Sequence, residues 1–147
     1  MIRESLKELY TRDLEKVEKE INAFENESEL WDLSGNITNT PGNLVMHIAG
    51  NLLHFFGAVL GQTGYVRERE IEFNGRLRKD ELLAEIARTK KDVLDTLDRL
   101  SDEDLQADYP LEVFGKKMKT GFFLINLHGH LNYHLGQINY CRRILSA

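Results

Sequence analysis

The sequence predicts an all-α protein, a four-helix bundle formed by a single domain over residues 1–147. Four stretches of roughly twenty residues repeat apolar side chains at spacings of three and four, which is typical of amphipathic helices. The connections between these stretches are polar, and no repeat or low-complexity tract interrupts the pattern. Four amphipathic helices bury their apolar faces most simply against one another.

The first helix is expected over residues 2–24, and a long loop over residues 25–40 follows it. The loop is polar and holds the only tryptophan, Trp31, which we expect to pack the loop onto the bundle. Apolar residues recur along this helix at spacings of three and four, with charged residues between them. The apolar residues are Ile2, Leu6, Leu9, Tyr10, Leu14, Val17, Ile21 and Phe24.

The second helix is expected from Pro41 to Gly61. Thr40 offers a hydroxyl to cap free backbone N–H groups, and Pro41 occupies the first helical position, where no N–H is needed. Gly50, Gly57 and Gly61 lie near one stripe of this helix. We interpret that stripe as a place where another helix packs closely.

The third helix is expected to begin with Asp80 as its cap and to end before the acidic run of residues 101–104. Its apolar face consists of Leu82, Leu83, Ile86, Val93, Leu94, Leu97 and Leu100. A face of this width predicts one more core helix.

A short hairpin is the favoured interpretation of the segment before the last helix. Residues 109–114 and 116–119 flank Gly115, which suits a turn, although Pro110 counts against a regular strand. The fourth helix is then expected over residues 121–145.

Composition and charge narrow the classes of function. The formal net charge is -5, and the densest cationic patch is only residues 116–119, so nucleic acid is not an expected partner. Asn51 and His54 interrupt the most apolar stretch, so no membrane span is expected. A charged N-terminal segment and a single cysteine, Cys141, favour the cytoplasm. A small-molecule substrate is the remaining expectation.

All five histidines fall within the second and fourth helices. His130 and His134 are four residues apart and share a helical face with apolar residues, so both rings should point into the core. The same count turns His47 inward. Three neutral imidazoles from two facing helices can bind a divalent ion, with Zn²⁺ or Ni²⁺ favoured, and leave one position open. The alternative is a compact polar core without an ion.

Other polar residues are assigned around this cluster. Asn51, one turn after His47, and Gln137, near the face of the histidine pair, are candidates to orient ligands or bound water; the alternative is ordinary helix-surface hydrogen bonding. His54 lies about 10.5 Å along the axis from His47, too far to share its ion, and is a candidate for the mouth of a pocket. His128 points away from the pair and is left outside the site.

Two short runs resemble a known family. Residues 130–138, HLNYHLGQI, resemble the signature of the last helix in the DinB/YfiT-like superfamily of metalloenzymes, and residues 43–50, NLVMHIAG, resemble its second-helix ligand. The family commonly has an arginine after the last ligand, where this chain has Leu135. The resemblance implies a four-helix bundle with a long loop between its first two helices. It also implies a metal triad of His47, His130 and His134.

The resemblance further implies a metal-dependent enzyme that activates a low-molecular-weight thiol for transfer to an electrophile. A metal-dependent hydrolase with the same ligands is the second interpretation. The third is a non-catalytic metal-binding stress or regulatory protein. A homodimer is expected, because dimers are the commonest soluble oligomers and the family points the same way. A solvent-open pocket at the ion would favour an enzyme.

Overall fold

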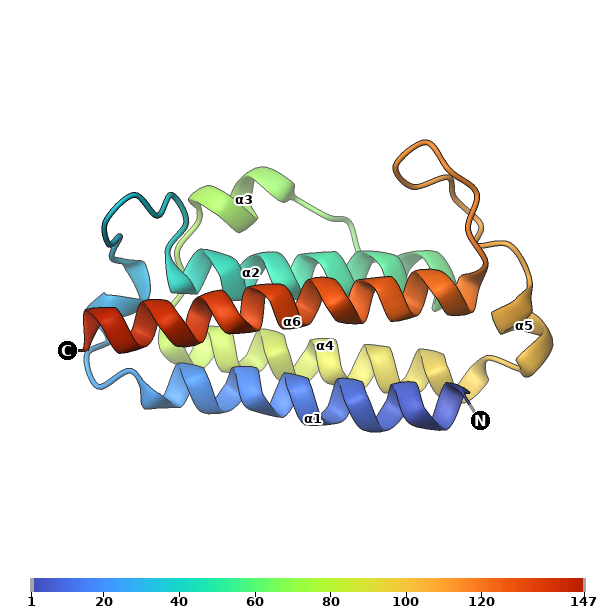
Figure 1. The fold of residues 1–147 in the computed structure, drawn as a ribbon, viewed down its shortest axis with the longest axis horizontal. Coiled ribbons are helices and arrows are strands. Elements are labelled where there is room, and N and C mark those ends of the chain that lie inside the picture. The colour runs from blue at the N-terminus through green and yellow to red at the C-terminus, as the bar shows by residue number, and fades with distance from the viewer. Residues whose placement is uncertain (1, 147) are drawn as a thin grey trace.

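Four long helices form the bundle in the structure, a computed structural model that describes residues 2–146 (Figure 1). They are α1 (Ile2–Ala23), α2 (Pro41–Leu52) with its continuation η2 (Leu53–Leu60), α4 (Lys79–Arg99) and α6 (Thr120–Leu145). The connections carry the short helices η1 (Glu27–Trp31), α3 (Arg69–Asn74) and α5 (Asp102–Gln106). About 72% of the chain is helical, and residues 2–146 contain no strand, which confirms the predicted all-α class.

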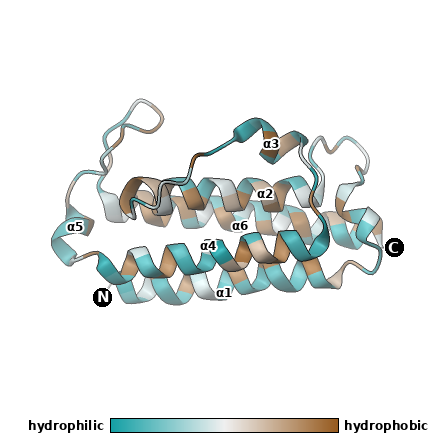
Figure 2. Ribbon diagram, turned by 180° about the vertical axis from the view of Figure 1, so that it is seen from behind, coloured by the Kyte–Doolittle hydropathy of each residue, from teal (hydrophilic) through white to brown (hydrophobic). Residues whose placement is uncertain are grey.

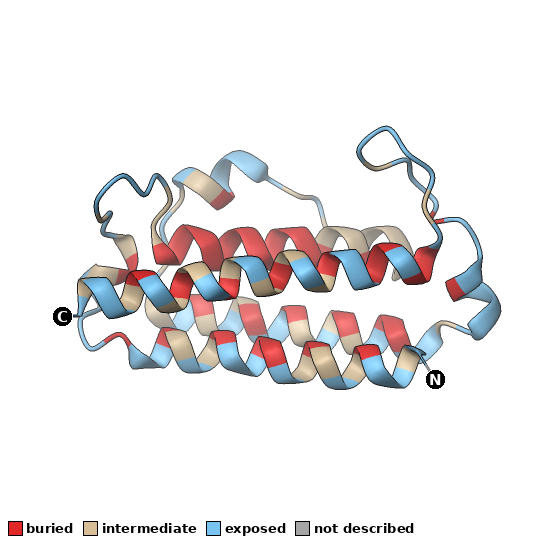
Figure 3. Cartoon of the chain, viewed as in Figure 1, coloured by how far each residue is buried: buried red, intermediate tan, exposed pale blue. Residues whose placement is uncertain are grey.

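Helix α2 forms the centre of the core. All of its residues are buried, and Figure 3 shows the continuous buried surface along it. The outward faces of α1 and α4 are hydrophilic, as Figure 2 shows. The predicted cap is present, because the Thr40 hydroxyl accepts the N–H of Asn43 at 3.1 Å. Residues Pro41–Leu60 are long and apolar enough to cross a membrane, but 72% of the relevant window is buried inside the bundle, which is typical of a core helix.

The end of the second helix differs from the prediction in type. The helix continues as expected towards Gly61, but Leu53–Leu60 form a π-helix. The N–H of Gly61 donates to the carbonyl of Phe56, five residues back, at 2.8 Å. The carbonyl of Phe55 accepts the hydroxyl of Tyr109 at 2.7 Å. A partner from a distant segment therefore takes one of the backbone acceptors of this wider helix.

The start of α4 also differs from the prediction. Its N-cap is Arg78, whose backbone N–H donates to Oε1 of Glu81 at 2.9 Å. Asp80 lies inside the first turn and pairs with the Arg78 side chain at 3.2 Å. The carboxylates of this turn suit the positive end of the helix dipole, but the predicted cap at Asp80 is wrong by two residues.

The segment before α6, hereafter the 108–119 loop, has the outline of the predicted hairpin. Two isolated antiparallel bridges join Asp108 with Lys119 and Val113 with Lys116, without extending into strands. Phe114 and Gly115 turn the chain with φ of 55° and 68°. The loop stands on the same side of the bundle as α3 (Figure 1).

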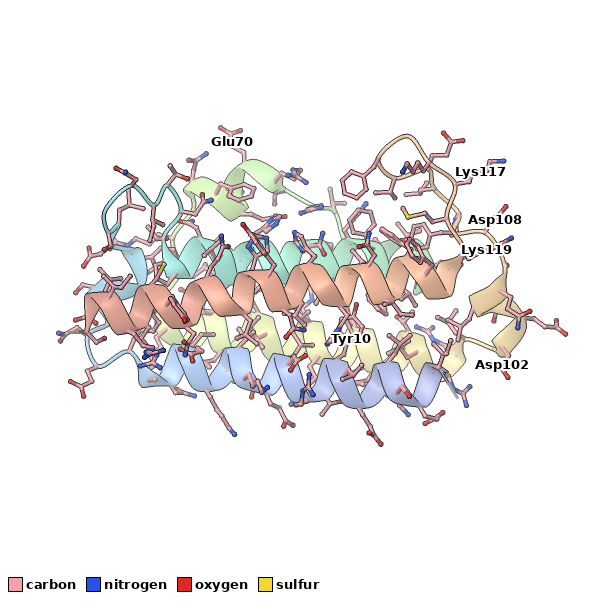
Figure 4. All side chains as sticks on the ribbon, viewed as in Figure 1. Tyr10, Glu70, Asp102, Asp108, Lys117 and Lys119 are labelled. Atoms are coloured by element: carbon pink, nitrogen blue, oxygen red, sulfur yellow. The ribbon has the colours of Figure 1, made fainter. Side chains whose placement is uncertain are left out.

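His128 lies away from the other α6 histidines, as predicted, and faces α1. Its Nε2 lies 2.6 Å from Oδ2 of Asp13, a carboxylate with no solvent exposure. Asn132 donates to the same oxygen at 2.9 Å, and Arg12 donates to Oδ1 at 2.8 Å. Figure 4 shows Tyr10, one turn away on α1, between the helices. Burial raises the pKa of Asp13, but these hydrogen bonds outweigh it and hold the pKa well below its ordinary value.

Asp13→Asn is expected to lower the free energy of unfolding at pH 7 by about 1.5–3 kcal/mol, the range for hydrogen bonds to a charged group. The folded-state pKa lies below the unfolded one, so this stabilisation is present above about pH 4 and is lost as the pH falls through the folded value. Arg12 and Lys16 on α1 and His128 and Asn132 on α6 are the groups that face the carboxylate. Urea unfolding of the unchanged protein and of Asp13→Asn at pH 7 and pH 3 measures the effect. The difference between their free energies of unfolding should be smaller at pH 3, and an equal difference at both pH values would contradict the prediction.

Candidate metal centre

Three histidine rings meet between α2 and α6. Nε2 of His130 lies 3.2 Å from Nε2 of His47 and 3.1 Å from Nε2 of His134. One ring nitrogen from each residue lies within 4.8 Å of the other two. His47 is buried and the other two are half-buried. The structure thus brings together the three residues that the sequence singles out.

The ring nitrogen of His47 that points away from the cluster, Nδ1, contacts a buried ion pair between Glu72 and Arg67. Its Nδ1 lies 3.0 Å from Oε1 of Glu72, a residue of α3 that is only 4% exposed. Arg67 holds the same carboxylate with two bonds, from Nε at 2.8 Å and from Nη2 at 3.0 Å. Burial raises the pKa of Glu72, but the bonds from His47 and Arg67 outweigh it and keep the pKa below its ordinary value. Glu72 is therefore ionised and accepts the N–H of His47.

The ring nitrogen of His134 that points away from the cluster also has a hydrogen-bond acceptor, which lies on α6 itself. Its Nδ1 donates to Oε1 of Gln137 at 2.7 Å. Gln137 thus contacts the ring of His134, and its role in orienting a metal ligand stays a prediction. Because Nδ1 carries the proton in both His47 and His134, their Nε2 atoms present lone pairs towards Nε2 of His130.

This arrangement fits a divalent cation. If Nε2 of His130 carries a proton, its N–H can donate to Nε2 of His47 or of His134 but not to both. A cation, by contrast, can bind the lone pairs of all three Nε2 atoms. Two nitrogens bound to one tetrahedral zinc at about 2.0–2.1 Å lie roughly 3.3 Å apart, close to the two separations that His130 makes with its neighbours. Burial, followed by the neighbouring rings of His134 and His47, lowers the pKa of His130 to about 4. Its ring is therefore neutral at pH 7.

A cavity of about 680 Å³ opens beside the cluster. His47 and His130 line it, together with Asn51. Its other walls come from residues 123–129 of α6, and from Arg67, Arg69 and the 108–119 loop, which lie on the same side of the bundle (Figure 1). Two of the three histidines thus border a cavity of the size that small-molecule sites commonly have.

The remaining predicted residues fall in different places. Asn51 lies one turn after His47, and its buried Oδ1 has no hydrogen-bond partner among residues 2–146. His54 packs edge-on against the ring of Phe55 and is not among the residues that line the 680 Å³ cavity. Cys141 is buried, and burial raises the pKa of its thiol, as suits the small hydrophobic residue that the sequence predicts.

The sequence interpretation missed Glu72, Arg67 and the role of Gly50. A methyl group at Gly50 would lie 2.0 Å from Oε2 of Glu72, so the glycine leaves room for this carboxylate and not for another long helix. Asn43 fastens α3 to α2, because its Nδ2 donates to the carbonyls of Glu72 and Gly75. In sequence, Glu72 ends a run of alternating charges that is typical of a solvated surface. Gly50 indicated a close approach, but the sequence interpretation assigned that approach to another helix and not to the Glu72 side chain.

Comparison with known proteins identifies the family. A family model described as the DinB superfamily matches residues 5–138, so the chain belongs to the DinB superfamily, as its histidine motifs predicted. The structure resembles that of a DinB-like protein from Bacillus cereus ATCC 10987, with a TM-score of 0.77 and 19% sequence identity over 97% of this chain and 92% of that chain. That likeness concerns the fold. Among curated proteins, none matches the chain.

Proposed function

We propose that this protein is a metal-dependent enzyme in which His47, His130 and His134 hold one divalent ion, Zn²⁺ or Ni²⁺, next to a small-molecule substrate. The observation that carries the proposal is the set of three Nε2 atoms that face one another, with two of the outer nitrogens already hydrogen-bonded. Proteins commonly orient metal-binding histidines in this way, through a carboxylate or amide behind the ring.

The reaction that we propose is the transfer of a low-molecular-weight thiol to an electrophile. A divalent ion on three imidazoles supplies an open position that favours the thiolate over the thiol at neutral pH. Glu72 and Gln137 hold the rings of His47 and His134 in orientation. The aromatic side chains that line the cavity, Phe55 and Phe123, limit water beside the reacting sulfur.

Cobalt substitution tests the thiol step. Adding the cognate thiol from a panel of cellular thiols to the cobalt-loaded protein should produce an intense near-ultraviolet sulfur-to-metal charge-transfer band. Cys141→Ala should leave the band intact, because that thiol is buried away from the three rings. If no thiol gives a band and no model electrophile is consumed, the transferase proposal fails, and hydrolysis or a non-catalytic role takes its place.

The expected homodimer stays a prediction that light scattering can measure. Exposed apolar side chains along α6 support it, since such residues on one helix suit contact with a second copy. They are Phe122, Ile125, Tyr133, Tyr140 and Ile144.

A further inference from the structure

One side chain that lines the cavity beside the histidine cluster carries a buried acceptor that the protein does not satisfy. Asn51 is 7% exposed, and its Oδ1 finds no donor within residues 2–146. A buried carbonyl oxygen without a donor is energetically costly, so proteins seldom retain one without a reason. Asn51 lines the cavity one turn from His47, and rotation of its side-chain amide would present Oδ1 to a ligand that carries an N–H or O–H group.

The guanidinium of Arg67 offers the complementary group in the same cavity. Its side chain is 9% exposed, and Nε and Nη2 both donate to Glu72. The third nitrogen, Nη1, donates to no acceptor in the described part of the chain. A guanidinium held from behind by a carboxylate presents a rigid pair of N–H donors on its free edge, the geometry that suits a carboxylate ligand.

A second arginine widens this donor edge. Arg69 lines the cavity two residues further on, forms no ion pair within residues 2–146, and places its guanidinium 6.0 Å from the centre of the Phe73 ring. Glu112 lines the cavity from the 108–119 loop and is not paired with Arg69 in that part of the chain. The arginines and Glu112 come from the two segments that rise on one side of the bundle, where Figure 4 labels Glu70 and Lys117.

Apolar surface completes the cavity. Phe55 and Phe123 pack edge to face with their ring centres 5.1 Å apart, and the Arg67 guanidinium lies 5.9 Å from the centre of the Phe55 ring. Phe114 lines the cavity from the turn of the 108–119 loop and is 83% exposed, which is unusual for so large an apolar side chain. An apolar group bound here would cover these rings.

We infer that this cavity binds a small organic carboxylate with an apolar body and an N–H or O–H donor. The carboxylate meets Arg67 and Arg69, the donor meets Oδ1 of Asn51, and the body lies against Phe55 and Phe123. The assignment of this ligand as the substrate rests on the proposed function. Binding itself does not, because none of these groups is one of the three histidines.

Three matched probes test the inference on chelator-treated protein by isothermal titration calorimetry. N-acetyl-L-phenylalanine carries all three features, its neutral amide lacks the carboxylate, and 3-phenylpropanoate lacks the N–H. The acid should bind about 10-fold more tightly than the amide, as expected for hydrogen bonds to a charged group. It should also bind more tightly than 3-phenylpropanoate.

Single substitutions separate the contributions. Arg69→Gln should remove most of the preference for the acid over the amide, and Asn51→Leu should remove the preference for the acid over 3-phenylpropanoate. Glu112→Gln is the matched control, since it removes the opposite charge from the same cavity and should leave acid binding equal or tighter. Circular dichroism checks that each variant is folded.

Equal binding of the acid and the amide, or no binding of any probe, would overturn the inference. An unchanged preference in Arg69→Gln would do the same. A further contrary result is that the acid binds only to metal-loaded protein and fails to bind the His130→Ala variant. In that case a metal ion, and not the arginines, holds the carboxylate, and the inference is overturned as well. The failure of the thiol proposal would appear in the cobalt spectrum and would leave these titrations unaffected.

Discussion

Changing His130 and His134 together to alanine is expected to abolish stoichiometric metal binding, from about one divalent ion per chain to less than about a tenth of that. His47→Ala should cause a loss of the same kind, because each histidine supplies one of only three converging nitrogens. Elemental analysis of protein purified without chelators measures the content. Alanine favours helix, so α6 should remain folded in the double variant.

His128→Ala is the matched control on the same helix. It removes an imidazole two residues from His130, but one that contacts Asp13 on α1 and not the cluster. We expect this variant to keep its ion and to lose stability, because the buried Asp13 carboxylate loses a hydrogen bond. Stoichiometric metal in the double variant would place the ion elsewhere in the protein.

The helices and the three histidines could be predicted because both depend on local periodicity. A spacing of four puts His130 and His134 on one face, and the apolar neighbours on that face turn the rings inward. The same counting turns His47 inward on the second helix. Counting along a helix cannot predict the position of a side chain that is held by residues distant in the sequence.

Glu72 shows where this reasoning stops. Nothing local distinguishes it from the three charged residues Glu68, Arg69 and Glu70, all of which are exposed. It is buried because Arg67 and His47 donate hydrogen bonds to its carboxylate, and because Gly50 has no side chain that would occupy the same space. The π-helix η2 could not be predicted for the same reason. The hydroxyl of Tyr109 donates to one of its carbonyl groups, and no apolar pattern within Leu53–Leu60 indicates this distant partner.

The second large effect is expected at Glu72. Glu72→Gln keeps the shape of the side chain but removes the charge that accepts from both His47 and Arg67. We expect metal affinity to fall by about 10–100-fold, the usual cost of losing the group behind a histidine ligand. Competition with a chromophoric chelator measures the affinity. The three ligands remain in place, so the ion should still bind at saturating metal.

Gly50→Ala reaches the same carboxylate from the other side and is the sharper test. Its added methyl group would lie 2.0 Å from Oε2 and 2.4 Å from Cδ of Glu72, so the carboxylate must move away from His47. We expect a loss of affinity similar to that of Glu72→Gln. The cost to folding should be smaller than this clash suggests, because alanine favours helix by roughly 1 kcal/mol over glycine and the displaced group is the end of a flexible side chain.

Gly136→Ala provides the control, because a methyl group there meets nothing within 4 Å and lies on α6, two residues after His134. It should gain the same helix propensity and bind metal as the unchanged protein does. The comparison isolates the displacement of Glu72 from the general effect of adding a methyl group to a helix. If Gly50→Ala binds metal as tightly as Gly136→Ala, Glu72 does not orient His47, and the Arg67–Glu72 pair serves only to stabilise the segment of residues 67–72.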